Sequence, residues 1–431
     1  MRNLYPRRMV AYSTRVVDRL LDRYLEGLPA VALQGPKGVG KTATAQQRVK
    51  RTIDLSDQFA REAFRAAQDP LAGLDGATLI DEWQREPGSW DQVKRAVDGG
   101  VAPGSFLIAG SSTPPGATVH SGAGRILTLR MRPLSLYERG VAVDGVSLAE
   151  LLDGGKPAIA GTTSVDLRVY THEILASGLP GIRRTPVDLR QDQIDAYLDA
   201  TVSQEFAEQG VSVRRPATLR AWMAAYAAAT ATTSTYTTIL DAATPGLPDK
   251  PARSTTLVYR DVLTRAFLLD PLEPWMPSRN HLKRLGQTPK HYLADPALAA
   301  RLLGASENGL LAGRPAGPDV PRDGTLLGAL FEHLVASSVQ VYGQAARART
   351  GHLRTQDGRH EVDLIVERDG AVLALEVKLA ATVTDDDVKH LIWLREQIGE
   401  DLADAAVIST GPDAYRRRDG IAVIPAALLV P

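Results

Sequence analysis

The sequence predicts an α/β protein with a parallel sheet near its start, a helical middle region and a second α/β unit at its end. Three observations predict this fold. Short apolar segments alternate with helix-like segments through the first third of the chain, helical patterning dominates afterwards, and two alternating segments meet at Asp369-Gly370. Strands that alternate with helices favour a parallel sheet with covering helices, and Asp-Gly between alternating segments favours a β-hairpin.

The first third is expected to contain one leading helix and a set of short strands. The helix is predicted from apolar residues at helical spacing in STRVVDRLLDRYLEGL, residues 13–28. Each strand is a short apolar segment, and helical segments separate most of them. The strands are expected at residues 30–35, 51–57, 77–82, 105–112 and 125–131.

The middle region is predicted from periodicity and turn residues. Residues 133–240 have mostly helical patterning, and the composition of residues 243–256 indicates a loop. An amphipathic helix is expected to follow, with Ser254 or Thr255 as its N-cap. A second loop, rich in Gly and Pro, is expected at 304–324. After it we expect a helix at 325–342 and hairpin strands at 360–368 and 371–379.

Composition limits the classes of protein to consider. The 431 residues are 44% hydrophobic and 23% charged, as in globular proteins of about two to four domains. Lys plus Arg and Asp plus Glu both total 50, so net charge gives no support for nucleic-acid binding. The lack of cysteine excludes disulfides and fits a reducing compartment. The N-terminus lacks an apolar signal core, and no segment could span a bilayer, so we expect a cytoplasmic protein without membrane contact.

A glycine-rich segment between the first strand and a helix matches a phosphate-binding loop in residue type, spacing and context. Glycines let backbone N–H groups turn inward around an anion. Lys41 is expected to reach the β- and γ-phosphates of ATP, and the Thr42 hydroxyl is expected to bind Mg²⁺. The alternative is a glycine-rich turn that binds nothing. The nucleotide-binding residues predicted here are Gly35, Pro36, Lys37, Gly38, Val39, Gly40, Lys41 and Thr42.

Acidic and polar residues follow two later strands. Asp81 is predicted to hold Mg²⁺ through water, and Glu82 to polarise the attacking water, although adjacent acids also occur at ordinary strand ends. Ser111 and Ser112 end the next strand, where a sensor of the γ-phosphate would sit. Arg125 is a candidate catalytic finger or, equally, a surface arginine.

The Asp-Gly hairpin places four charged residues together. A two-residue loop makes Asp363 face Glu376 and Glu361 face Lys378, with directly opposed residues on the same face of the sheet. Opposed like charges destabilise a sheet, and a divalent cation would offset the repulsion between Asp363 and Glu376. Two alternatives remain: a surface salt bridge between Glu361 and Lys378, and a degenerate fold without metal.

The motifs LQGPKGVGKT, TLIDEWQREP, LIAGSS and GRILTLRMRPLSLYE resemble the AAA-type ATPase domain of a large bacterial and archaeal family of ATP-binding proteins. ASGLPG, HYLADPALAARLL and GALFEHLV with EVDLIVE and ALEVKL resemble the family's C-terminal domain, DUF4143. This resemblance implies three domains: an ATPase domain at 1–140, a helical lid and winged-helix-like region at 141–285, and DUF4143 at 286–431.

The C-terminal domain also resembles restriction-endonuclease-like nucleases. That resemblance implies that Asp363 and Glu376 hold Mg²⁺, that Lys378 positions or activates water, and that Glu332 supplies an additional acid. The proline that this superfamily has before the aspartate is Val362 here.

Three helices in the middle region are compatible with a helix-turn-helix or winged-helix unit. Arg253, Arg260 and Arg265 lie on or beside the third helix and could meet phosphates of a nucleic acid. Packing against neighbouring elements is the favoured alternative, because the arginines form no clear basic cluster.

Two functions follow from these predictions. The first is a Mg²⁺-dependent ATPase coupled to a nuclease-like domain that acts on or binds DNA or RNA. The second is an ATP-dependent switch or interaction protein whose nuclease-like domain is not catalytic. If Arg125 serves a neighbouring active site, the protein is a homo-oligomer.

Overall fold

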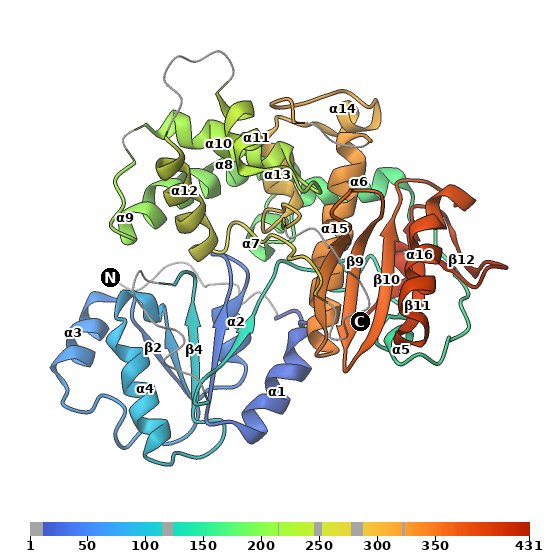
Figure 1. Ribbon diagram of the computed structural model, residues 1–431. Helices are drawn as coiled ribbons and strands as arrows, with labels where there is room; N and C mark the ends of the chain where they lie inside the picture. The colour runs from blue at the N-terminus through green and yellow to red at the C-terminus, as the bar shows by residue number, and fades with distance from the viewer. Residues whose placement is uncertain (1–11, 114–123, 214, 245–251, 277–287, 321–323) are drawn as a thin grey trace.

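The computed structural model describes residues 12–113, 124–213, 215–244, 252–276, 288–320 and 324–431. The chain forms three units: an N-terminal α/β unit, a helical region above it, and a C-terminal α/β unit beside both (Figure 1). The first unit has the predicted parallel sheet, and the last is built on the predicted hairpin.

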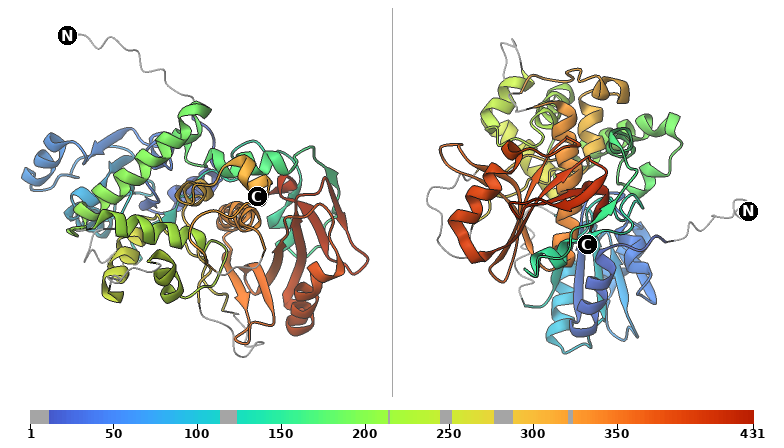
Figure 2. Two further views of the ribbon diagram at one scale, coloured as in Figure 1. Left: turned by 90° about the horizontal axis from the view of Figure 1, so that it is seen from above. Right: turned by 90° about the vertical axis from the view of Figure 1, so that its right-hand side faces the viewer.

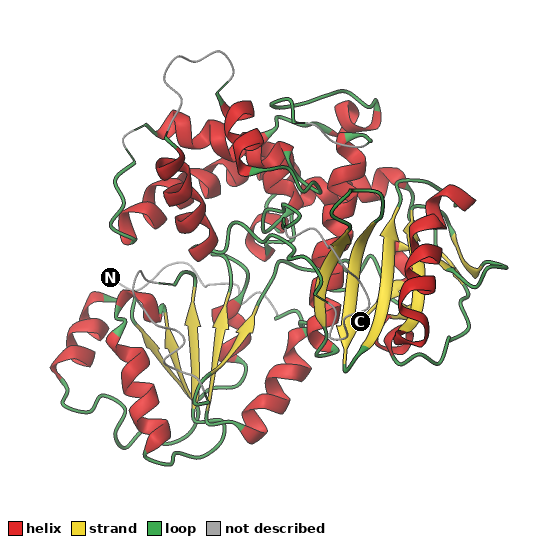
Figure 3. Cartoon of the chain, in the orientation of Figure 1, coloured by secondary structure: helices red, strands yellow, loops and turns green. Residues whose placement is uncertain are grey.

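The N-terminal sheet has the strand order β2-β3-β4-β1-β5, and every pair is parallel. All five predicted strands and the leading helix are confirmed. The strands are β1 Ala30–Gln34, β2 Arg51–Asp54, β3 Thr78–Asp81, β4 Phe106–Gly110 and β5 Leu127–Arg130. The helices are α1 Val17–Gly27, α2 Lys41–Gln46, α3 Gln58–Ala66 and α4 Gly88–Asp98, with a 3-10 turn at Trp83–Arg85. The carboxyl ends of the strands point toward the helical region (Figure 3).

The three central strands, β3, β4 and β1, are buried along their whole length, as expected of strands covered on both faces of a parallel sheet. Alternate residues of β1 enter different cores, because successive side chains of a strand point to opposite faces. Val31 and Leu33 belong to the large core that continues into the other units, whereas Ala30 and Ala32 pack in a separate cluster with Trp83.

The helical region begins at α6, and helices and turns make up most of its described residues up to α12. Its elements are α6 Leu167–Ala176, α7 Pro180–Arg183, a 3-10 turn Val187–Leu189, α8 Arg190–Ala200, a π-helical turn Thr201–Glu205, α9 Phe206–Glu208, α10 Pro216–Ala228, α11 Tyr236–Ala243 and α12 Arg253–Arg265. The three predicted helices are present, but no β wing accompanies them among these residues. The predicted N-cap was wrong: α12 begins at Arg253, and Ala252 precedes it.

The C-terminal unit is a seven-stranded sheet of order β7-β12-β13-β11-β10-β9-β8. Its elements are α15 Leu326–Ala345, β8 Arg349–Arg354, β9 Glu361–Arg368, β10 Ala371–Val377, α16 Asp385–Ile398, a 3-10 turn Gly399–Asp401, β11 Leu402–Ser409, β12 Asp413–Arg416, β13 Ala422–Pro425, a 3-10 turn Ala426–Leu428 and β14 Leu429–Val430. Helix α13 Pro296–Leu302 and helix α14 Glu307–Leu311 precede α15. The predicted loop at 304–324 therefore contains one short helix.

One segment of the predicted middle region, residues 146–162, belongs structurally to the C-terminal unit. β7 Gly161–Thr162 pairs with β12, and β6 Val146–Ser147 pairs with β14. Between them, α5 Leu148–Leu152 packs against the C-terminal sheet. This segment lies in the predicted middle region by sequence but adds strands to the C-terminal unit.

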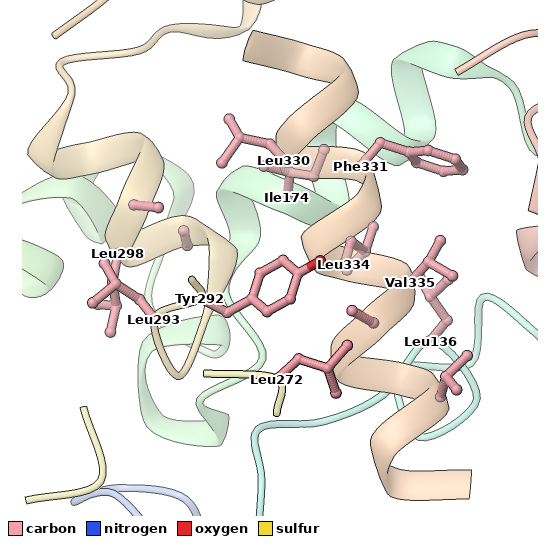
Figure 4. Packing of buried hydrophobic residues seen from close by; sticks show 14 of the residues in the cluster. Leu136, Ile174, Leu272, Tyr292, Leu293, Leu298, Leu330, Phe331, Leu334 and Val335 are labelled. Atoms are coloured by element: carbon pink, nitrogen blue, oxygen red, sulfur yellow. The ribbon is translucent and has the colours of Figure 1, made fainter. Parts of the chain in front are cut away.

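Helix α15 holds the three units together. Seen from above, it lies between the helical region and the C-terminal sheet (Figure 2). Leu330 and Leu334 of α15 lie in one core with Ile174 of the helical region and with Leu136, which follows β5 (Figure 4). Gln344 also donates from its Nε2 to the carbonyl of Arg130 at 2.8 Å. Among the described helices none has the length and apolarity to cross a membrane.

Candidate functional site

The loop between β1 and α2 has a conformation that depends on glycine. Gly38 and Gly40 adopt φ angles of 75° and 103°, in the left-handed region that residues with a Cβ rarely occupy. A Cβ on Gly35 would lie 2.2 Å from the carbonyl oxygen of Met131, so only glycine fits against the neighbouring strand. The predicted phosphate-binding loop therefore has the backbone geometry its sequence implies.

Lys41 is the first residue of α2, directly after this loop, and is buried, with 5% of its surface exposed. Its Nζ donates to the carbonyl oxygens of Gly35 at 2.8 Å and Pro36 at 3.0 Å. Among the described residues, no carboxylate forms an ion pair with it. Burial lowers the pKa of Lys41 to about 8, despite the opposing charges of Glu82 and Asp81. The Lys41 ammonium is thus bonded to backbone carbonyls, and the acids near it compensate its burial only in part.

Thr42 and Asp81 meet at the carboxyl edge of the sheet. The Thr42 hydroxyl donates to Oδ2 of Asp81 at 2.8 Å. Burial raises the pKa of Asp81, against the lowering effect of the Thr42 hydrogen bond. A hydroxyl and a carboxylate beside a phosphate-binding loop are oxygen ligands of the kind that Mg²⁺ takes, so these residues fit the ion implied by the sequence.

Glu82 is held in an unusual conformation directly after β3. Its φ angle of 53° is uncommon for a residue other than glycine, and such outliers occur at functional sites where the surroundings maintain them. Gln84 donates to Glu82 Oε2 at 2.5 Å and to Ser111 Oγ at 3.1 Å, while the Ser111 hydroxyl lies 3.4 Å from the same Glu82 oxygen. The sequence indicated Glu82 and Ser111, but the residue that links them, Gln84, was missed.

Arg125 lies near the amino ends of the strands, whereas the phosphate-binding loop lies at their carboxyl ends. Strand β5 runs parallel to β1, with Arg130 beside Gln34. Arg125 precedes β5, whereas the loop follows β1, so the length of the strands separates them. Its guanidinium instead pairs with Asp98 at 2.6 Å. Arg125 does not reach the loop of its own chain, so its predicted role as a finger requires a neighbouring copy.

Arg130 is the arginine near the phosphate-binding loop, and it was missed from the sequence. Its positive charge contributes to the low pKa of Lys41, after the larger effect of burial. The guanidinium lies 4.3 Å from the centre of the Phe267 ring and pairs with Asp270 at 3.3 Å. Arg132 binds the same carboxylate at 2.7 Å. Two arginines of the N-terminal unit thus bind the segment that follows α12.

The helical region contacts the loop directly. Lys37 pairs with Glu205, at the end of the π-helical turn, with 2.7 Å between Nζ and Oε1. The Tyr197 hydroxyl donates to the carbonyl of Lys37 at 3.2 Å, and Arg85 pairs with Glu208 at 2.8 Å. The edge of the sheet that carries the predicted phosphate-binding loop therefore lies against α8, the π-helical turn and α9.

The C-terminal hairpin has the predicted register. Arg368 pairs with Ala371, and the loop residues Asp369 and Gly370 have φ angles of 53° and 88°, as in a type I′ turn. The last ladder pair is Leu375 with Leu364, and continuing this register by one residue places Asp363 opposite Glu376, as expected. The predicted chemistry of this cluster nevertheless needs correction, because other residues enter it.

Lys290 is the residue that the sequence prediction missed. Its Nζ lies 2.8 Å from Asp363 Oδ1, 3.0 Å from Glu332 Oε1 and 3.0 Å from Glu361 Oε1. Lys378 pairs with Glu376 at 2.8 Å, not with Glu361. The alternative of a Glu361–Lys378 salt bridge is therefore wrong.

Mg²⁺ does not fit the C-terminal carboxylates as they are arranged. Lys290 already binds Glu332 and Asp363, two of the three predicted ligands. Among the described residues, no group of three or more His, Cys, Asp or Glu is placed to hold a metal ion. Burial would raise the pKa of Asp363, but the charges of Lys290 and Lys378 outweigh it and hold that pKa below its usual value. The cation that the opposed acids require is thus supplied by the protein.

The arginines on α12 contact the protein itself. Arg260 lies over the ring of Tyr236, 4.5 Å from its centre, and Arg265 donates to the side-chain oxygen of Gln209 at 2.8 Å. Arg253 is exposed at the start of the helix. These contacts support the packing alternative for two of the three arginines.

Three family models match consecutive parts of the chain. One described as an AAA domain matches residues 28–139, and two described as domains of unknown function match residues 168–309 (DUF8612) and 327–429 (DUF4143). The predicted similarity to an AAA-type domain at the N-terminus and to DUF4143 at the C-terminus is confirmed. The N-terminal unit is therefore an AAA-type P-loop domain, in agreement with its sheet and loop.

Similar proteins cover most of the chain. The uncharacterized proteins Rv2008c of Mycobacterium tuberculosis and Mb2031c of Mycobacterium bovis are each 27% identical over 416 residues, which span 94% of this chain and 82% of the relative. The Walker-type ATPase PABY2304 of Pyrococcus abyssi is 14% identical, with 70% of this chain and 99% of the other covered at a TM-score of 0.41. ORC2 of Aeropyrum pernix, solved as ADPNP and ADP complexes, is 15% identical, with coverages of 69% and 94% and a TM-score of 0.30.

Proposed function

We propose that this protein binds ATP with Mg²⁺ at the P-loop and hydrolyses it. The observation that carries the proposal is the buried Lys41 ammonium, which is bonded only to carbonyl oxygens of its own loop. A buried charge without a charged partner is costly, and a phosphate would compensate it. Lys41 would then donate its hydrogen bonds to phosphate oxygens instead of to the carbonyl oxygens of Gly35 and Pro36.

Each remaining residue of the site has a role that its position supports. Thr42 and Asp81 would hold Mg²⁺, which when bound neutralises part of the phosphate charge. Glu82 would orient the attacking water and act as the general base that accepts its proton. Gln84 and Ser111 would fix the Glu82 carboxylate, which their hydrogen bonds already reach.

ATP binding is proposed to change the contacts between the helical region and the P-loop. Lys37 belongs to the loop that would close on phosphate, and it is paired with Glu205 of the helical region. Rearranging the loop around a nucleotide would alter this contact and the neighbouring Tyr197 hydrogen bond. We therefore favour an ATP-dependent switch, with the C-terminal domain as a binding module for a partner such as DNA or RNA.

Metal-dependent nuclease activity is the second candidate, supported by the opposed Asp363 and Glu376 and by Lys378 beside them. It requires that Lys290 leave the carboxylates it binds. An assay of single- and double-stranded DNA and RNA with Mg²⁺ or Mn²⁺ separates the candidates. Cleavage that is lost in Asp363→Asn would establish the nuclease, and no cleavage by the wild type supports the switch.

Glu82→Gln tests the proposed hydrolysis. Phosphate release from Mg·ATP should fall by about 10²–10⁴-fold, because a positioned general base typically contributes that much, while ATP binding remains. Glu86→Gln is the matched control, since its carboxylate, four residues along the chain, pairs with Arg65. Equal turnover in the wild type and Glu82→Gln would remove Glu82 from the mechanism, and no ATP binding by the wild type would overturn the proposed function.

A further inference from the structure

We propose that Lys290 is a built-in cation that takes the place of a divalent metal in the C-terminal domain. Its ammonium lies among Glu332 of α15 and Glu361 and Asp363 of β9, with all three distances between 2.8 and 3.0 Å. These carboxylates come from two elements that the fold brings together, and Lys290 comes from neither. This inference does not depend on the proposed ATPase activity.

The position of Lys290 is fixed by its own backbone. Its N–H donates to the carbonyl of Leu272 at 2.9 Å, and the N–H of Leu272 donates back to the carbonyl of Lys290 at 2.9 Å. Only 1% of the Lys290 surface is exposed. The side chain is therefore held inside the cluster and is not a surface lysine that could turn toward solvent.

Neighbouring groups also bind carboxylates of the cluster. Tyr292, two residues along from Lys290, donates its hydroxyl to Glu332 Oε1 at 2.6 Å. Arg354 pairs with the second oxygen of Glu361 at 2.9 Å, and Lys378 pairs with Glu376 at 2.8 Å. Every carboxylate of the cluster thus has a cationic partner from the protein.

A divalent ion and Lys290 would compete for the same oxygens. Mg²⁺ and Ca²⁺ bind carboxylate oxygens at about 2.0–2.6 Å, and an ion at that distance from Asp363 and Glu332 would lie against the Lys290 ammonium. Two cations in contact within a buried site repel strongly. We therefore expect the domain to need no metal for its stability, and removal of Lys290 should create a metal site.

Thermal unfolding of the full chain without nucleotide tests this inference with Mn²⁺ as the probe. The wild-type Tm should be the same in EDTA and in Mn²⁺. Lys290→Met should lower the Tm in EDTA, because buried carboxylates lose their counterion, and Mn²⁺ should restore part of the loss in a saturable way. The control Lys389→Met removes an exposed lysine that pairs with Asp386 and should change neither value.

The double variant Lys290→Met, Asp363→Asn should lose the Mn²⁺ effect, which would locate the ion in this cluster. If Lys290→Met does not fold in EDTA, Asp363→Asn alone still decides the matter. A lower Tm of Asp363→Asn in both EDTA and Mn²⁺ supports the inference, because Lys290 then loses a partner. A wild-type Tm that rises with Mn²⁺, with the rise abolished in Asp363→Asn but kept in Asp81→Asn, would overturn it.

Discussion

Two buried lysines, Lys41 in the P-loop and Lys290 in the C-terminal domain, show how partners decide what a buried charge does. Both are almost inaccessible, at 5% and 1% exposure. Lys41 is bonded to two carbonyl oxygens, whereas Lys290 is bonded to three carboxylates. The acids near Lys41 do not bind its ammonium directly, whereas those around Lys290 do.

The pKa values of the two lysines move in opposite directions for this reason. Burial lowers the pKa of Lys41 to about 8, because nearby acids compensate only part of the desolvation. Burial acts on Lys290 in the same sense, but Asp363 and Glu332 outweigh it and raise its pKa well above the ordinary value. A buried lysine is thus expected to bind an anionic ligand only where the protein leaves part of its charge uncompensated.

Replacement of Lys41 should have the largest effect on nucleotide binding. Lys41→Met removes a charge-assisted contact to phosphate worth about 3 kcal/mol, so the affinity for Mg·ATP should fall about 100-fold. Lys378→Met, which removes a lysine from the C-terminal cluster, should leave that affinity unchanged. Titration with a fluorescent ATP analogue measures both, and a similar loss in the two variants would contradict the comparison.

The pH dependence of ATP binding sharpens the contrast. Because the pKa of Lys41 is about 8 in the empty site, the lysine is charged below that pH and mostly neutral above it. Above pH 8 the site must take up a proton to pair with phosphate, so the affinity should fall about tenfold per pH unit. Lys41→Arg should lack this fall, because arginine stays charged. A flat wild-type profile over the two units above pH 8 would contradict the pKa of Lys41.

Arg125 should have the smallest effect. Its ion pair with Asp98 is largely exposed, and such pairs contribute little. At concentrations where the chain is monomeric, Arg125→Ala should change ATP turnover by less than about twofold. A large loss of ATP turnover in the monomer would contradict the position of Arg125 at the amino ends of the strands, away from the phosphate-binding loop. The role in a neighbouring copy is tested separately, by mixing Arg125→Ala with Lys41→Met chains and looking for restored activity.

The sequence predicted the parts of the sites that are contiguous in the chain. Gly35 to Thr42 define their own geometry, because glycine spacing and the flanking strand and helix are local. The two-residue turn likewise fixes which hairpin residues face each other, so Asp363 and Glu376 were correctly paired.

The parts that were missed depend on contacts between distant segments. Lys290 and Asp363 are in contact although they are 73 residues apart in the sequence, and Arg130 and Asp270 are 140 residues apart. The hairpin register predicted two opposed carboxylates, and from these a metal ion was inferred. The counterion that replaces the metal comes from outside the hairpin, so no local sequence pattern indicates it. Gln84 was missed for another reason: its role arises only where the turn after β3 folds back onto Ser111.

The most direct test of this account is the number of Mn²⁺ ions bound per chain at equilibrium, measured with and without a non-hydrolysable ATP analogue. The account predicts one ion per chain with the analogue, held at the P-loop by Thr42 and Asp81, and none without it. Two ions with the analogue, or one without it that disappears in Asp363→Asn, would show that the C-terminal cluster binds metal despite Lys290.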